Sequence, residues 1–416
     1  MTFVTRVWMK LTQNKALEEH SGRIEKMFFE SIYRVFYITG LSHSNTSVGY
    51  FIYSSIIKTL NLLLLCSEIG QFFHMTWTVD AIIDSANIII IQLGTLYKYC
   101  NMITHRKVFK ALAMAMESPN FDISTKARKD LLAVWVKRNR INTIFLLMLG
   151  VITLTSWYSF PLMDDIDYNL MLAVYVPFDY ENPTMYPIVY FILVLVFSYV
   201  SYGVMIIDII MQTYLMQLLC QYIVLNDCLC NIGTECAENF KGMSDIELLY
   251  NDQFRKKYRR RLGDLIIQHK FILDKTMELR KVLSGPMLGH MCGSTILICS
   301  IGYQIVMSLS VNITKCVMSF LYLGYNMFIL YMICRWCEDI TKQGEGVGFA
   351  AYCSGWERGY TTIPGVRSSL LIILTRANKP LVFTAGGMYD LSLDNYSNLV
   401  KTSYSALTML LRFRNE

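Results

Sequence analysis

Long apolar stretches alternate with polar, charged stretches along the chain. A helix needs about 20 mostly apolar residues to cross a bilayer, because the hydrocarbon core is about 30 Å thick and each residue rises about 1.5 Å. Four stretches without a charged residue meet or approach this length: 141–163, 182–207, 282–314 and 316–334. Three further stretches are interrupted by charges: 48–66, 79–97 and 388–411. We therefore predict an all-α, polytopic membrane protein with seven transmembrane helices.

Two polar connections also have helical spacing. In residues 98–140, apolar side chains recur every three or four positions on both sides of the break Ser118-Pro119-Asn120. Apolar positions between Leu262 and Leu283 continue into the stretch that begins at 282. These patterns predict helical extensions of the spans into the cytoplasm. The glycine-rich run 344–348 lacks the Lys-Ser/Thr of a nucleotide-binding loop, so we predict a flexible turn there.

The distribution of Lys and Arg orients the spans, because basic connections remain on the cytoplasmic side. Residues 1–47 carry six basic residues, 98–140 ten, 218–286 eleven and 338–387 five. The connections 67–78 and 162–186 carry none. We therefore expect a cytoplasmic N-terminus and, after seven spans, an extracellular C-terminus. The sequon at Asn312 then lies in a short outer connection and is a glycosylation candidate.

Composition agrees with a membrane protein. Hydrophobic residues make up 54% of the chain and charged residues 17%, against about 25% charged in soluble domains. These values exclude a disordered chain, a collagen-like fibre and a small disulfide scaffold. The expected setting is a lipid bilayer.

The sequence contains no recognisable catalytic, metal-binding or nucleic-acid-binding motif. None of the twelve cysteines has histidines nearby at zinc-site spacing, and no Ser/His/Asp arrangement is evident. We expect no enzymatic activity, no cofactor, no metal and no nucleic-acid partner. The basic cluster 255–261 lies in a predicted inner connection, where it faces solvent or lipid headgroups, or alternatively binds anionic lipid or calmodulin.

Ionisable residues near the last span are candidates for function. Asp390 and Asp394 are four residues apart, so on a helix they share a face near the inner end of this span. Around a symmetric oligomer they form an acidic ring that favours cations; alternatively, they reach inner water and pair within the subunit. A stripe that includes Ser403, Leu407 and Leu410 either narrows a pore or packs against neighbouring helices.

Aromatic residues gather near the predicted outer ends of the spans. Tyr and Trp at this depth form interfacial belts by default. Spacing such as Phe73/Trp77 and Tyr322/Tyr325 is also compatible with a cluster that holds a small apolar ligand. Both interpretations remain open for each residue.

The last fifth of the chain contains a series of short motifs: Ala351-Tyr352 with Trp356, Arg376-Ala377-Asn378-Lys379-Pro380, Thr384-Ala385-Gly386-Gly387, Leu391-Ser392-Leu393 and Lys401-Thr402-Ser403-Tyr404-Ser405. In order and spacing these motifs resemble the C-terminal signature of the insect odorant receptor family. Weaker similarity comes from His269 and from Val176-Pro177-Phe178-Asp179 in the acidic outer connection. The predicted orientation of the spans is also that of the family.

The resemblance implies an odorant-gated, non-selective cation channel that is a tetramer with olfactory co-receptor subunits. It also implies a location in the plasma membrane of olfactory sensory neuron dendrites. It divides the chain into a cytoplasmic N-terminal segment (1–47), six spans with their cytoplasmic helical extensions (48–337), a cytoplasmic anchor (338–387), and a pore-lining seventh helix with an extracellular C-terminus (388–416). Related gustatory receptors carry Gln-Phe where this chain has Leu410-Leu411, and the co-receptor carries a polar residue at the Leu410 position. The first difference favours an odorant receptor over a gustatory receptor, and the second favours the tuning subunit over the co-receptor.

The resemblance also implies site residues. The ligand, a small volatile odorant, is expected in the outer half of the bundle, and the pore and gate positions are Ser403, Leu407 and Leu410. The ligand-binding candidates are Phe73, His74, Trp77, Thr153, Trp157, Tyr190, Val194, Phe197, Met318, Tyr322 and Tyr325. The alternatives are a gustatory receptor channel and a G-protein-coupled chemosensory receptor. A G-protein-coupled receptor has the opposite orientation, and its Asn-Pro-x-x-Tyr motif is absent here.

Overall fold

The computed structural model describes residues 12, 22–42, 47–75, 77–119, 121–163, 166–240, 242–309 and 312–415; about half of the segment 1–47 lies outside them. In this part of the chain the predicted all-α fold is confirmed. In chain order the elements are α3 (Arg23–Ile38), α4 (Val48–His74), α5 (Val79–Thr104), α6 (Arg106–Ala113), η1 (Met114–Glu117), α7 (Lys126–Ser159), α8 (Met185–Cys230), α9 (Ile232–Ala237), η2 (Glu238–Phe240), α10 (Asp245–Tyr250), α11 (Asp252–Ser308), α12 (Ile313–Tyr352), η3 (Trp356–Arg358), η4 (Tyr360–Thr362), α13 (Val366–Ala377), β1 (Thr384–Ala385), β2 (Tyr389–Asp390) and α14 (Leu393–Asn415).

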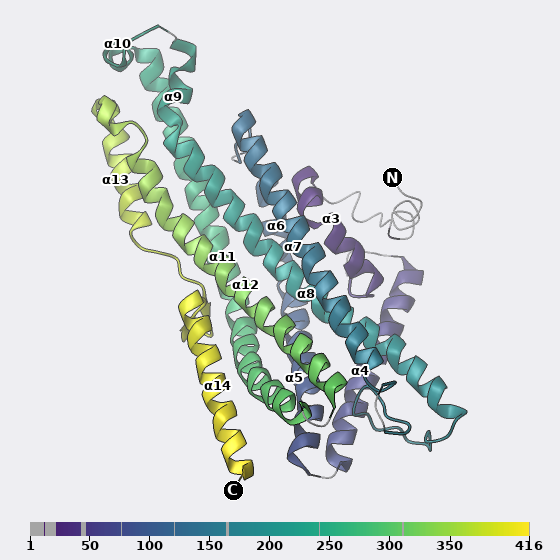
Figure 1. The fold of residues 1–416 in the computed structure, drawn as a ribbon. Coiled ribbons are helices and arrows are strands. Elements are labelled where there is room, and N and C mark those ends of the chain that lie inside the picture. Colours follow the sequence, from purple (N-terminus) through teal and green to yellow (C-terminus); the bar gives the residue numbers. More distant parts are fainter. Residues whose placement is uncertain are drawn as a thin grey trace.

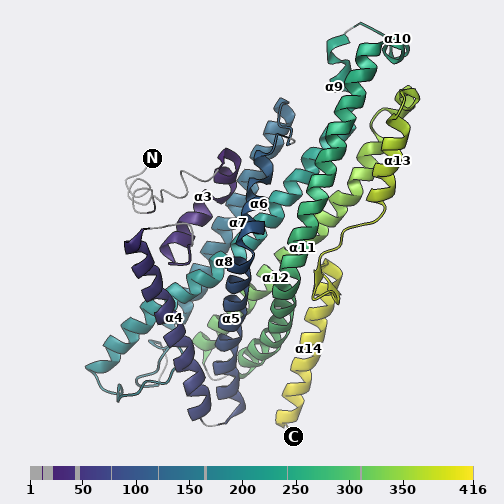
Figure 2. The ribbon, with the colours of Figure 1, turned by 180° about the vertical axis from the view of Figure 1, so that it is seen from behind.

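The long helices form one elongated bundle. Figure 1 shows α8, α11 and α12 running through most of its length, with α9, α10 and α13 gathered at one end and the C-terminus at the other. Seen from behind, α5 lies close to α11, and α14 stands at the edge of the bundle (Figure 2). α14 packs mainly against α11 and to a lesser extent against α12. The last helix is therefore connected to the rest of the chain chiefly through α11.

The apolar stretches coincide with long helices. Five described helical segments are long and apolar enough to cross a membrane: Val48–His74, Lys126–Ser159, Met185–Cys230, Asp252–Ser308 and Ile313–Arg358. The helices at the other two predicted spans, α5 and α14, are not among these five segments. The count of seven spans and the orientation of the termini stay predictions.

Polar residues before the apolar runs begin several of these helices. The side chains of Ser47, Thr78 and Thr125 accept hydrogen bonds from backbone amides in the first turns of α4, α5 and α7. Asn251 does so for α11 and Asn312 for α12. Such caps satisfy amides that have no partner inside the helix. The polar residues between spans thus fix where each helix starts.

The structure confirms the helical character predicted on both sides of the break in 98–140 and for residues 262–283. α6 and η1 end at Glu117, directly before the predicted break, and α7 starts at Lys126. α11 continues from Asp252 through Pro286 to Ser308 without interruption. A proline removes one amide donor and crowds the preceding turn, so contacts from other elements must maintain the helix there. One such contact comes from the turn between β1 and β2, where the Gly386 amide donates to the Ser284 carbonyl at 2.9 Å.

The prediction of a flexible turn at 344–348 is wrong, because this run lies inside α12. Its glycines permit close packing on two sides. A Cβ on Gly348 would lie 3.0 Å from the Cβ of Ala377 in α13, and one on Gly346 would lie 3.2 Å from Nδ2 of Asn226 in α8. A glycine costs a helix about 1 kcal/mol relative to alanine, and close packing between helices offsets that cost here.

The predicted seventh span starts later than expected. A hairpin of two short strands precedes α14, with Thr384 paired to Asp390 and Ala385 paired to Tyr389. Gly386 and Gly387 form its turn with φ values of 61° and 73°, which favour glycine. Asp390 therefore lies in β2, and the prediction that it shares a helical face with Asp394 is wrong.

A cluster of charged residues joins α7, α8, α9, α11 and the connection before α7 at the end of the bundle predicted to be cytoplasmic. The guanidinium of Arg128 in α7 is 0% exposed. It donates to Asp122 at 2.7 Å, to Asp227 of α8 at 2.9 Å, and to Glu235 of α9. Arg261 of α11 also donates to Asp122. Because each partner comes from a different segment, the cluster fixes how the helical extensions pack.

Candidate functional site

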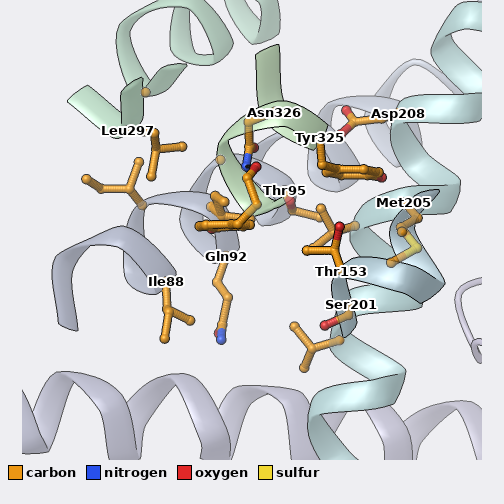
Figure 3. A pocket seen from close by; sticks show the side chains of 18 of the residues that line it. Ile88, Gln92, Thr95, Thr153, Ser201, Met205, Asp208, Leu297, Tyr325 and Asn326 are labelled. Carbon is orange, nitrogen blue, oxygen red and sulfur yellow. Dashed lines mark hydrogen bonds between the residues drawn. The ribbon is translucent and has the colours of Figure 1, made fainter. Parts of the chain in front are cut away.

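A cavity of about 110 Å³ lies inside the bundle, with walls from α5, α7, α8, α11 and α12. Figure 3 shows its side chains converging from these helices. Most of the lining is apolar, as in cavities that hold small organic ligands. The cavity is the leading candidate for a ligand site because five helices that are distant in sequence meet there.

Five of the predicted ligand-binding residues line this cavity. They are Thr153, Trp157, Phe197, Tyr322 and Tyr325. Trp157 is the centre of the aromatic group: its ring centroid lies 5.6 Å from that of Phe197 and 5.7 Å from that of Tyr322. These separations are typical of favourable aromatic pairs. The structure thus brings together residues from α7, α8 and α12 that the sequence separates widely.

The other six predicted residues lie outside the cavity. Phe73 and His74 end α4, and Trp77 follows in the connection to α5; all three are exposed, Phe73 by 70% and Trp77 by 67%. Met318 faces a second, outer cavity. Tyr190 and Val194 pack against the core, with the Tyr190 hydroxyl donating to the Tyr158 carbonyl at 2.6 Å.

The sequence-based prediction missed the walls formed by α5 and α11. The resemblance placed ligand-binding residues at the end of α4 and in the connection to α5, at Phe73, His74 and Trp77, whereas the α5 residues that line the cavity begin at Ile88. The α5 wall consists of Ile88, Ile90, Ile91, Gln92, Gly94, Thr95 and Lys98. The α11 wall consists of Gly289, His290, Gly293, Ser294 and Leu297. Gln92 lies inside the predicted span 79–97 and Lys98 directly follows it, and polar residues at these positions were the signal available in the sequence.

A buried ion pair lies at one end of the cavity. The Lys98 ammonium of α5 donates to Asp208 of α8 at 2.6 Å, and the two side chains are 8% and 6% exposed. Both line the cavity, together with His290. The pair neutralises two charges that are each costly in an apolar environment, and it ties α5 to α8.

A larger outer cavity of about 810 Å³ adjoins the first one. Ile88, Trp157 and Tyr322 line both cavities, so these three side chains separate them. The rim of the outer cavity includes Lys315, which pairs with Asp84 at 2.8 Å, and Asn312. The Asn312 side chain caps α12 by accepting from the Lys315 amide at 3.0 Å. Glycosylation at Asn312 stays a prediction.

The predicted pore and gate residues lie on the side of α14 that packs within the chain. Ser403 is fully buried, and Leu407 and Leu410 are half-buried. Leu407 covers Gly302 of α11, where an added Cβ would lie 2.9 Å from Leu407 Cδ2. Tyr404 and Met409 are exposed instead. Within one chain, the stripe thus packs against α11.

The start of α14 is fixed by α12. Its first amide, on Leu393, donates to Glu338 at 2.8 Å. Lys342 and the Leu393 amide both donate to Glu338, and these bonds lower the pKa of its carboxyl group. Asp394 lies in the first turn, where a negative charge stabilises a helix, and both Asp390 and Asp394 are exposed.

Comparisons with known proteins agree with this architecture. Residues 78–404 match the family model described as 7tm Odorant receptor. Odorant receptor 85b of Drosophila melanogaster is 25% identical over 183 residues, 44% of this chain and 46% of that protein. Odorant receptor Or2 of Anopheles gambiae is 23% identical over 154 residues, 37% of this chain and 39% of that protein. The matching segments thus span less than half the length of these relatives.

Two solved structures of an insect olfactory receptor have the same fold. OR5 from Machilis hrabei in complex with eugenol superposes with a TM-score of 0.76 over 93% of this chain and 98% of that one, at 16% sequence identity. The structure of the same receptor described without eugenol gives a TM-score of 0.74.

Proposed function

The chain belongs to the odorant receptor family, and from this premise we propose that it is the ligand-binding subunit of an odorant-gated, non-selective cation channel. The observation that carries the proposal is the position of α11. Leu297 of this helix lines the cavity, and Gly302, five residues later, lies under Leu407 of the last helix. A ligand that changes how α11 packs thereby acts on α14. Binding the open arrangement more tightly shifts a closed-to-open equilibrium.

We assign ligand contact to the residues around Trp157. Thr153, Trp157, Phe197, Tyr322 and Tyr325 form a largely buried, mostly apolar surface, which suits a small volatile molecule. The exposed Phe73 and Trp77 suit the interfacial belt instead. Their position at the end of α4 supports this division, because Trp and Tyr favour the membrane–water boundary.

The assembly that we propose is a tetramer with olfactory co-receptor subunits in the plasma membrane. It has seven spans per subunit, a cytoplasmic N-terminus, an anchor formed by the helical extensions and α13, and a pore lined by α14. The exposed carboxylates Asp390 and Asp394 support an acidic pore entrance. An anchor boundary at residue 338 falls inside α12, so the span and the anchor share one continuous helix.

Co-expression with the co-receptor in a cell without other chemoreceptors tests this function. A panel of volatiles is expected to evoke a cation current that neither subunit gives alone with the same ligand. A response that the chain gives alone and only through G proteins would contradict the proposal.

Shortening Leu407 is expected to raise the resting current. Leu407→Ala removes the side-chain atoms that cover Gly302, and Gly302→Ala displaces them by adding a Cβ 2.9 Å away. Losing about 1 kcal/mol of packing from the closed arrangement corresponds to about a fivefold change in the closed-to-open ratio. The measurement is resting current divided by maximal odorant-evoked current.

The matched control is Gly324→Ala in α12, where an added Cβ meets no atom within 4 Å. This variant is expected to keep the wild-type ratio. If Leu407→Ala and Gly302→Ala both behaved like Gly324→Ala at equal surface expression, the contact between α11 and α14 would have no role in gating.

A further inference from the structure

Several polar side chains of the inner cavity already have partners within the protein. Gln92 donates to Glu68 at 2.8 Å, Thr153 donates to the Leu149 carbonyl at 3.0 Å, and Asn326 donates to the Tyr322 carbonyl at 2.8 Å. Lys98 and Asp208 satisfy each other. These groups present little unsatisfied hydrogen-bonding capacity to a ligand.

The Tyr325 hydroxyl is different. Its side chain lines the cavity and is 6% exposed, yet its oxygen has no hydrogen-bond partner among the described residues. Nδ1 of His290, which lines the same cavity, also has none. Figure 3 shows the Tyr325 ring beside Asp208 at one end of the cavity. A buried, unpaired polar group costs about 1 to 3 kcal/mol, so a ligand that pairs with it gains affinity.

We propose that this cavity selects neutral molecules with one hydrogen-bond-accepting oxygen, such as a carbonyl group, on a small apolar body, and that the Tyr325 hydroxyl donates to that oxygen. The inference rests on the proposed function only in taking this cavity as the ligand site. It adds a chemical class of ligand and a residue that recognises it.

Charge and hydrogen-bonding capacity define the class. Lys98 and Asp208 already neutralise each other, so a charged ligand would bring an uncompensated charge into a buried site. A carbonyl group brings an acceptor and no donor. It therefore pairs with the Tyr325 hydroxyl without adding a donor that needs a partner of its own. A hydrocarbon of the same shape leaves the hydroxyl unpaired.

Cavity size limits the apolar body. The volume of about 110 Å³ is slightly below that of an engineered protein cavity of about 150 Å³ that binds benzene. A single ring or short chain with a small oxygenated substituent matches this scale. The rings of Trp157 and Phe197 provide the apolar contact surface for such a body.

Isosteric ligand pairs test the proposal. Acetophenone and α-methylstyrene differ only by C=O against C=CH₂, as do benzaldehyde and styrene. Binding to the purified full chain in lipid nanodiscs is measured by ligand-dependent thermal stabilisation. For each pair, the affinity for the carbonyl compound is divided by the affinity for its hydrocarbon isostere. This ratio is compared between variants, so that the effect of ligand partitioning into lipid cancels. We expect Tyr325→Phe to lower the preference for the carbonyl compound by about three- to tenfold.

Tyr158→Phe is the matched control. It also removes one hydroxyl, but that hydroxyl bonds to Ser198 at 2.7 Å and lies outside both cavities. The wild-type ratio is expected to persist in this variant. An equal ratio in wild type and Tyr325→Phe, or the absence of binding by both carbonyl compounds, would overturn the inference. If the binding assay gave the predicted change in ratio but co-expressing cells showed no odorant-evoked current, the result would support the inference and contradict the proposed channel function.

Discussion

Arg128→Met is expected to destabilise the folded chain by about 3 kcal/mol, one of the two largest effects that we predict. The guanidinium is 0% exposed and donates to carboxylates from three segments. Without it, the carboxylates of Asp122, Asp227 and Glu235 lose their shared cation. Arg261 still pairs with Asp122 and Glu235. Breaking a buried pair from one side costs about 3 to 5 kcal/mol, and partial exposure of these carboxylates places the estimate at the lower end.

The measurement is the melting temperature of the detergent-solubilised chain, followed by loss of the monodisperse chromatographic peak. Arg255→Met is the control, because Arg255 is partly exposed and pairs at 3.5 Å with Asp252, one turn away. Exposed pairs contribute about 1 kcal/mol or less. Equal melting temperatures for the two variants would show that the Arg128 cluster does not hold the helical extensions together.

Lys98→Met is expected to lower the free energy of unfolding by a comparable amount, and therefore to reduce the quantity of folded protein at the cell surface. It leaves the Asp208 carboxylate, 6% exposed, without its partner ammonium. Asp208→Leu leaves the Lys98 ammonium in the same position. Each single change is expected to cost about 3 to 5 kcal/mol, whereas replacing both charges by apolar groups is often nearly neutral. The double variant is therefore expected to be more stable than either single variant.

Surface labelling and melting temperature of the four proteins complete this double-mutant cycle. A recovery of at least about 2 kcal/mol in the double variant would identify the ion pair as a direct link between α5 and α8. Additive losses would contradict it and would indicate that each side chain is needed for separate reasons. The cycle has its control built in, since the double variant keeps both substitutions.

Much of the fold followed from local patterns. Apolar runs and helical spacing located the long helices and their extensions, and the break at Ser118-Pro119-Asn120 fell between η1 and α7. The errors came where tertiary contacts outweigh local preference. Glycines at 344–348 lie in a helix because α8 and α13 pack closely against them, and Asp390 lies in a strand because Gly386 and Gly387 form a turn against α11.

The candidate site was predictable only in part. Aromatic character pointed to Trp157 and Tyr322, whose partners are also aromatic. The polar end of the cavity required tertiary information, because Lys98 and Asp208 are separated by 110 residues and no local pattern relates them. The unpaired state of the Tyr325 hydroxyl likewise depends on what the neighbouring helices leave unfilled.

The most direct test of the account is a recording from excised outside-out patches of cells that express the chain with the olfactory co-receptor. With no nucleotide in the pipette, an odorant that binds the cavity is expected to open unitary cation-selective channels, and Leu407→Ala is expected to raise their opening without ligand. Responses that vanish on excision and return only when G proteins or second messengers are supplied would contradict the central claim.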